Sequence, residues 1–141
     1  MTKDDLAFRI ARAHEKHDKG YNCAQSVCCA FCDLTDFDEK TMFCLTEGLG
    51  LGMGGMDGTC GAIAAAAVLS GAKCSTGNLE TPNSKGNSYR QAKVCLQKFK
   101  EKNGALACRD LKGVDTGEAL RPCAGCISDA VEIIAEELFG D

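Results

Sequence analysis

Apolar residues recur along most of the chain at the three- and four-residue spacing that is typical of amphipathic helices. Over residues 3–19 this spacing predicts a helix with one apolar face, and Gly20 is expected to end it. The same spacing predicts a helix starting at Asn22 and others over residues 62–70, 89–103 and 122–138. Asp36 or Asp38 is expected to cap a further short helix that runs through Leu45. No segment alternates with the period of a strand. The chain is therefore predicted to be all-α, with one domain over residues 1–141 that forms a compact bundle of five to six helices.

Glycines interrupt this pattern over residues 46–61, which contain seven of them. Each glycine costs about 1 kcal/mol relative to alanine inside a helix. The stretch is therefore predicted to be a loop whose backbone can approach another group closely. We expect Asp57 or Thr59 to cap the helix that follows and Gly71 to end it. That helix is apolar on all sides, which predicts a position at the centre of the bundle.

Charge and hydropathy exclude several classes of function. Lys and Arg number 16 and Asp and Glu number 20, for a formal net charge of −4. This balance disfavours a nucleic-acid partner, because such partners are bound by basic surfaces. The longest apolar run has eight residues, whereas a membrane helix needs roughly 20, and the N-terminus lacks the apolar segment of a secretory signal. We expect a cytoplasmic protein with no membrane partner.

Cysteine is the residue type that points to a function. The chain contains 11 cysteines, an odd number, so intramolecular disulfides cannot pair them all. Structural disulfides are rare in the reducing compartment expected for this chain. This many cysteines therefore indicates metal binding or redox chemistry.

Four cysteines lie where a thiolate is favoured. Cys23 follows a predicted helix cap, Cys60 begins the central helix, and Cys123 lies in the first turn of the last helix. Unpaired N–H groups at helix starts stabilise a thiolate there. Cys108 is expected in a loop just after a helix, beside Arg109, which could offset negative charge. Any one of them could instead be a small buried hydrophobe. As a group they predict one metal site that only tertiary structure can assemble.

Other cysteines offer weaker signals. Cys28, Cys29 and Cys32 form a C-C-x-x-C run in which Cys28 and Cys32 share a helix face. These two could be metal ligands or a redox pair. We favour the alternative in which Cys28 is part of the apolar stripe of the helix. Cys123 and Cys126 form a C-x-x-C at a helix start, without the βαβ context of a thioredoxin-like protein. The remaining cysteines have no predicted chemical role: Cys44, Cys74 and Cys95.

Three further cofactor sites are disfavoured. Residues 50–55 match G-x-G-x-x-G, but no strand precedes them, as a dinucleotide site requires. His14 and His17 are spaced for one helix face and could ligate a metal, but we favour partly exposed histidines near a helix end. No two C-x-x-C pairs stand at zinc-ribbon spacing.

Several segments, in order, resemble a known family. They are Gly20-Tyr21-Asn22-Cys23-Ala24-Gln25, the loop 48–55 leading to Cys60-Gly61-Ala62, Lys100-Glu101-Lys102-Asn103-Gly104 with Cys108-Arg109-Asp110-Leu111, and Cys123 ahead of 130–134. Together they resemble the C-GCAxxG-C-C family, which is named for its cysteine pattern and regarded as redox-active. The literal string GCAxxG does not occur, and the nearest match begins at Cys60. The resemblance implies a small helical redox protein with Cys23, Cys60, Cys108 and Cys123 as its functional set.

The predicted function is electron transfer by an iron–sulfur cluster, of either the [2Fe–2S] or the [4Fe–4S] type, because four thiolates meet the ligand count of both. The predicted metal ligands are Cys23, Cys60, Cys108 and Cys123, and the predicted backbone contacts to the cofactor come from Gly52, Gly54, Gly55 and Gly58. One alternative is a thiol–disulfide oxidoreductase in which Cys123 or Cys23 attacks and Cys126 resolves. Another is a zinc or other metal-binding module. The expected partner is a redox partner protein, and a homodimer stays open because a second chain could supply a missing ligand.

Overall fold

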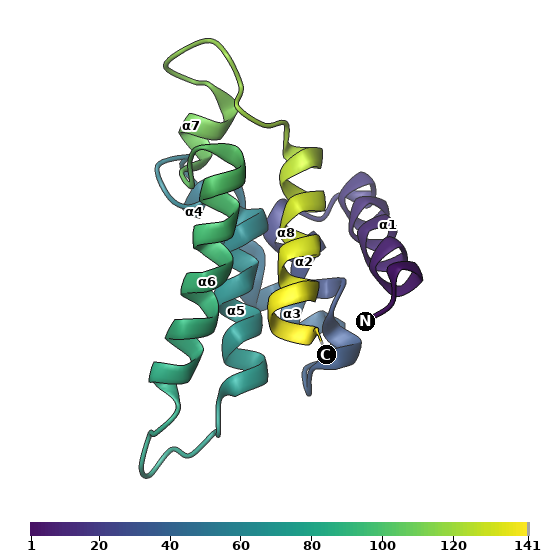
Figure 1. The fold of residues 1–141 in the computed structure, drawn as a ribbon, viewed down its shortest axis with the longest axis vertical. Coiled ribbons are helices and arrows are strands. Elements are labelled where there is room, and N and C mark those ends of the chain that lie inside the picture. The colour runs from purple at the N-terminus through teal and green to yellow at the C-terminus, as the bar shows by residue number, and fades with distance from the viewer. Residues whose placement is uncertain (141) are drawn as a thin grey trace.

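Helices make up most of the computed structural model, which describes residues 1–140 (Figure 1). Seven helices and one short irregular turn, labelled α4, follow one another along the chain: α1 (Lys3–Lys19), α2 (Cys23–Cys29), α3 (Glu39–Thr46), α4 (Gly50–Met53), α5 (Gly61–Cys74), α6 (Lys85–Asn103), α7 (Cys108–Lys112) and α8 (Cys123–Phe139). Two 3-10 turns, η1 (Cys32–Leu34) and η2 (Glu47–Leu49), join them. The all-α prediction is confirmed. The predicted number of helices was too low, because the five residues of α7 are too few to show a periodicity.

The boundary between α1 and α2 follows the local sequence closely. Gly20 ends α1 in the left-handed conformation, with φ 119°. Asn22 then accepts a hydrogen bond from the N–H of Gln25, and the Gln25 side chain accepts one from the N–H of Asn22, each at 2.9 Å. This reciprocal pair is the predicted capping box. It makes Cys23 the first residue of α2.

The central helix is α5, which packs against α2, α6 and α8. Its residues Ile63, Ala65 and Leu69 are fully buried, as expected for a helix that is apolar on all sides. The predictions for its ends were wrong. Cys60, rather than Asp57 or Thr59, is the N-cap residue, and the helix continues through Gly71 to Cys74. Burial of the preceding residues outweighs the cost of one glycine in the helix.

Corrections elsewhere concern where helices begin. Helix α6 begins at Lys85, four residues before the predicted start, and Pro122 is the N-cap residue of α8 rather than part of its first turn. Cys108 was expected in a loop after a helix, but it is the first residue of α7. The first turns of α5, α7 and α8 lie at the same end of the molecule (Figure 1).

The C-terminal helix closes the core. The predicted apolar stripe of α8 is buried against α1, α5 and α6: Ile127, Ala130, Val131, Ile134 and Leu138. In residues 1–140, no helix combines the length and the apolar character that crossing a membrane requires.

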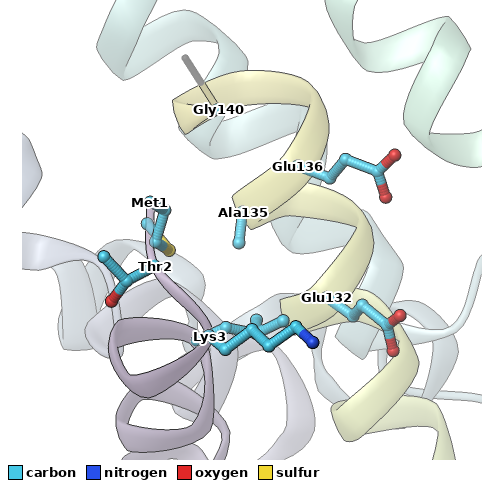
Figure 2. Close-up of a pocket in the computed structure, with 8 residues that line it drawn as sticks. Met1, Thr2, Lys3, Glu132, Ala135, Glu136 and Gly140 are labelled. Atoms are coloured by element: carbon cyan, nitrogen blue, oxygen red, sulfur yellow. The ribbon is translucent and has the colours of Figure 1, made fainter.

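A shallow cleft lies between the start of α1 and the end of α8 (Figure 2). Met1, Thr2 and Lys3 line one side of it, and Glu132 and Glu136 lie on the other. Its volume is about 420 Å³, and its lining contains no cysteine. The redox chemistry indicated by the composition must therefore be sought elsewhere.

Candidate functional site

A cavity of about 290 Å³ lies where the first residues of α2, α5, α7 and α8 meet. All four cysteines that were predicted as metal ligands line it, together with a fifth: Cys23, Cys60, Cys108, Cys123 and Cys126. Its other lining residues are His17, Asn22, Leu51, Gly61, Lys112 and Arg121. The fold thus brings together thiols that are far apart in the sequence.

Each of the four predicted ligands occupies the start of a helix. Cys23, Cys108 and Cys123 are the first residues of α2, α7 and α8, and Cys60 is the N-cap residue of α5. The first N–H groups of a helix have no partner within that helix. They can therefore donate to sulfur, and the N–H groups of Ala62 and Ile63 do so to Cys60.

A short antiparallel contact joins Cys60 and Cys108. The N–H of Cys60 donates to the carbonyl of Leu106 at 2.7 Å, and the N–H of Cys108 donates to the carbonyl of Gly58 at 2.9 Å. The residues that precede the two cysteines, Thr59 and Ala107, form an isolated bridge. Two helix starts separated by 48 residues are thereby held side by side.

The glycine-rich loop packs against Cys108 and contributes few residues to the lining of the cavity. A Cβ at Gly52 would lie 2.5 Å from the Cβ of Cys108, and Gly52 has a φ of +58°. Only glycine therefore fits this contact without strain. Gly54 has open space around it, as does Gly55. From the stretch 46–61, Leu51, Cys60 and Gly61 line the cavity, whereas the four predicted glycines do not.

The backbone contacts to a cofactor predicted for Gly52, Gly54, Gly55 and Gly58 stay a prediction. Two of these residues contact Cys108. Gly52 packs against its side chain, and the carbonyl of Gly58 accepts a hydrogen bond from its N–H. The loop also carries Leu51 with a φ of 55°. A non-glycine residue in this region is strained, and such strain is common at functional sites.

Two pairs of thiols are hydrogen-bonded within the cavity. A hydrogen bond between the Cys60 and Cys126 thiols, together with nearby N–H groups, lowers the pKa of Cys60 to about 7 against the opposing effect of burial. The same contact raises the pKa of Cys126 above its ordinary range. The Cys126 thiol also donates to the carbonyl of Arg121 at 3.8 Å. Cys60 is 6% exposed and Cys126 is 2% exposed. The thiol-exchange alternative, in which Cys123 or Cys23 attacks and Cys126 resolves, stays a prediction.

The second pair is Cys23 and Cys123. Burial raises the pKa of the Cys23 thiol to about 12, and the charges of Cys123 and Cys60 raise it further. Lys112 opposes this effect, because its ammonium favours the thiolate forms of Cys23, Cys60 and Cys108. Lys112 was not predicted as a site residue. It lies four residues after Cys108 on the same helix face, a signal that appears only once Cys108 is placed in a helix.

Arg121 lines the cavity and pairs with the buried carboxylate of Asp129 in α8. Its guanidinium donates to the carboxylate of Asp129 at 3.1 and 3.2 Å, and the ammonium of Lys102 lies 2.8 Å from the same carboxylate. The Asp129 side chain is only 3% exposed. Burial alone would raise the pKa of Asp129, but the hydrogen bonds from Lys102 and Arg121 outweigh it and lower the pKa below its usual value.

The cavity thiols are not placed as the ligands of one metal ion. Within residues 1–140, no three or more His, Cys, Asp and Glu side chains are placed to hold one metal ion. The zinc alternative therefore gains no support from the geometry. A cluster makes a different demand, because its iron atoms are separate and its four cysteine ligands need not meet at one point.

The two histidines take structural contacts. His14 shares a hydrogen bond with Ser128 at 2.7 Å, and His17 contacts the carbonyl of Tyr21 at 3.1 Å through Nδ1. Both are partly exposed near the end of α1, as expected. His17 also lines the cysteine cavity, which periodicity alone did not indicate.

A comparison with known protein families places this chain in one of them. A family model described as "Putative redox-active protein (C_GCAxxG_C_C)" matches residues 21–137, a span that includes every cysteine of the cavity. The chain belongs to the C_GCAxxG_C_C family. It is a cysteine-rich member of a family described as redox-active, and the resemblance inferred from its segments is confirmed. Searches among curated proteins and among solved structures found no match for this C_GCAxxG_C_C protein.

Proposed function

We propose that this protein transfers electrons through an iron–sulfur cluster held by Cys23, Cys60, Cys108 and Cys123. One observation carries the proposal: four thiols from four separate helix starts converge on one cavity. Four cysteine thiolates are the usual ligand set of [2Fe–2S] and [4Fe–4S] clusters. Membership of a family described as redox-active supports the same class of chemistry.

The residues around the cavity suit a group of this kind. The cavity volume of about 290 Å³ is much larger than the roughly 30 Å³ that one water molecule occupies in the liquid, so the cavity has room for a group larger than water. A cluster with four thiolates is a net anion, which the ammonium of Lys112 and the N–H groups of the helix starts stabilise. When bound, the cluster supplies the one-electron oxidation and reduction.

The chain itself orients the ligands and limits access to them. Cys60 and Cys108 are buried, whereas Cys23 and Cys123 are partly exposed. The side of the site that carries Cys23 and Cys123 is therefore the one that a redox partner protein would approach. Electron transfer falls with distance, so this half-open side favours exchange with such a partner.

Anaerobic purification and reconstitution with iron and sulfide test the proposal. We expect a brown protein that contains iron and acid-labile sulfide and bleaches on reduction. Cys108→Ser, or the same change at Cys23, Cys60 or Cys123, should lower both contents. A colourless protein with neither element after reconstitution would refute cluster binding.

Two further variants control this experiment. Cys95→Ser changes a fully buried cysteine of α6 that does not line the cavity, and it should keep the cluster. Cys126→Ser should also keep it, because Cys126 is outside the proposed ligand set. Loss of iron from Cys126→Ser alone, with the helical circular dichroism unchanged, would contradict that ligand set.

A second candidate function is thiol–disulfide exchange by Cys60 and Cys126, which the hydrogen bond between their thiols favours. In this reaction the two thiols lose two protons and two electrons to form a disulfide, while a partner disulfide is reduced to two thiols. Cluster-free protein treated with a small disulfide separates the two functions. A Cys60–Cys126 disulfide that forms reversibly supports exchange, and its absence leaves only the cluster proposal.

A further inference from the structure

A second pair of cysteines lies outside the cavity, at the other end of α2. Cys29 is the last residue of α2, and Cys32 is the first residue of η1. Neither lines the cavity, although Cys23 begins the same helix. Six residues of helix place Cys29 about 9 Å along the axis from Cys23. The two cysteines form a C-x-x-C pair that the proposed cluster does not use.

The thiols of this pair contact each other. A hydrogen bond joins the Cys29 and Cys32 thiols. Each thiol also contacts a backbone carbonyl, Cys29 that of Glu39 at 3.9 Å and Cys32 that of Cys28 at 3.7 Å. Cys29 is fully buried, whereas Cys32 is partly exposed. One thiol is therefore accessible to a reagent, and its hydrogen-bond partner is buried.

The turn between the two cysteines is clamped by Arg9. Its guanidinium donates to the carbonyl of Ala30 and to both carboxylate oxygens of Asp33, each at 2.8 Å. Phe31, also within the turn, is fully buried and stacks on Phe139. These contacts fix the turn between the two cysteines and the residue that follows it.

Charged groups from two helices surround Cys32. Lys16 and Arg12 of α1 favour its thiolate, and Glu39 of α3 opposes it while pairing with Lys16 at 2.9 Å. The hydrogen bond with Cys29 is the largest influence and lowers the pKa of Cys32, whereas it raises that of Cys29. An accessible thiol with a lowered pKa beside a buried thiol with a raised pKa is the arrangement of an attacking and a resolving cysteine.

We infer that Cys29 and Cys32 are a second redox site, a dithiol that cycles to a disulfide with Cys32 as the attacking thiol and Cys29 as the resolving thiol. The co-reactant is a small disulfide of the glutathione class. The Cys32 thiolate attacks one of its sulfurs, which breaks the S–S bond and releases one thiolate. Cys29 then loses its proton and attacks the Cys32 sulfur, releasing the second thiolate and leaving a protein disulfide. This inference does not depend on a cluster.

Glutathione disulfide, titrated into the full-length protein, tests the inference. After blocking of remaining thiols and tryptic digestion, we expect the peptide over residues 20–40 to lose two hydrogens and to regain them on reduction. Cys29→Ser should instead trap glutathione on Cys32, because no resolving thiol remains. Cys32→Ser should abolish both products in this peptide.

Two controls keep the test specific. Cys28→Ser removes the adjacent buried thiol, which donates to the carbonyl of Ala65, and keeps the Cys28 carbonyl that the Cys32 thiol contacts, so it should leave the disulfide intact. Cys44→Ser removes an exposed thiol and should also change nothing. The inference is overturned if wild-type peptide 20–40 acquires only glutathione adducts, or if Cys28→Ser abolishes the disulfide. Because cluster content is measured separately, failure here leaves the cluster proposal standing.

Discussion

The contact between the glycine-rich loop and Cys108 can be tested by Gly52→Ala. Gly52 has a φ of +58°, and a Cβ there would lie 2.5 Å from the Cβ of Cys108 and 2.8 Å from the carbonyl oxygen of Gly58. Neither neighbour can give way easily, because the N–H of Cys108 is itself bonded to that carbonyl. The added methyl group must therefore displace either the loop or the start of α7.

Two separate costs contribute to the expected loss of stability. A left-handed conformation costs an alanine about 1–2 kcal/mol, and overpacking at a buried contact adds about 1–3 kcal/mol. Gly52→Ala should therefore lower the free energy of unfolding by about 2–5 kcal/mol. Gly54→Ala is the matched control. Gly54 also has a positive φ, of +83°, but a Cβ there meets nothing within 4 Å, so only the conformational cost applies.

Urea unfolding followed by circular dichroism measures both variants, and iron content after reconstitution reports on the site. We expect Gly52→Ala to be less stable than Gly54→Ala by the overpacking cost and to hold less iron. Equal stability losses in the two variants would show that the loop does not press on Cys108. The account of the loop as a support for the cavity would then be wrong.

Three other perturbations have defined outcomes in urea unfolding. Because hydrogen bonds hold the pKa of Asp129 below its ordinary value of 3.8, its stabilising effect is present above that value and lost as pH falls through the lowered pKa. Asp129→Asn should thus lower the free energy of unfolding by about 2 kcal/mol at neutral pH. The difference from wild type should shrink in acid, and a constant difference across pH would contradict this. Arg9→Met should cost about 2–3 kcal/mol by leaving the Ala30 carbonyl without its buried donor; a change below about 0.5 kcal/mol would argue against the clamp. Ala65→Leu, at a fully buried position of α5, should cost about 1–3 kcal/mol, while Ala67→Leu at an exposed one should be near neutral; equal effects would argue against tight packing there.

Local sequence rules worked where the decisive partners are close in the chain. The capping box of Asn22 and Gln25, the left-handed Gly20 and the buried stripe of α8 each depend on residues within a few positions of one another. Such interactions favour the same structure whatever surrounds them. The local sequence rules failed where tertiary contacts outweigh helix propensity. Gly71 is an example, because it stays helical while the residues before it are buried.

The sequence by itself determined the all-α class and the helix start at Cys23, because hydrophobic period and caps are properties of neighbouring residues. It also singled out the cysteines through their number. Only the tertiary structure decided that Cys60 meets Cys126 and that Lys112 faces the thiols, since these contacts join helices that are far apart along the chain. The helical start at Cys108 likewise depends on the bridge to the glycine-rich loop. Long-range packing sets such distances, and no local pattern encodes them.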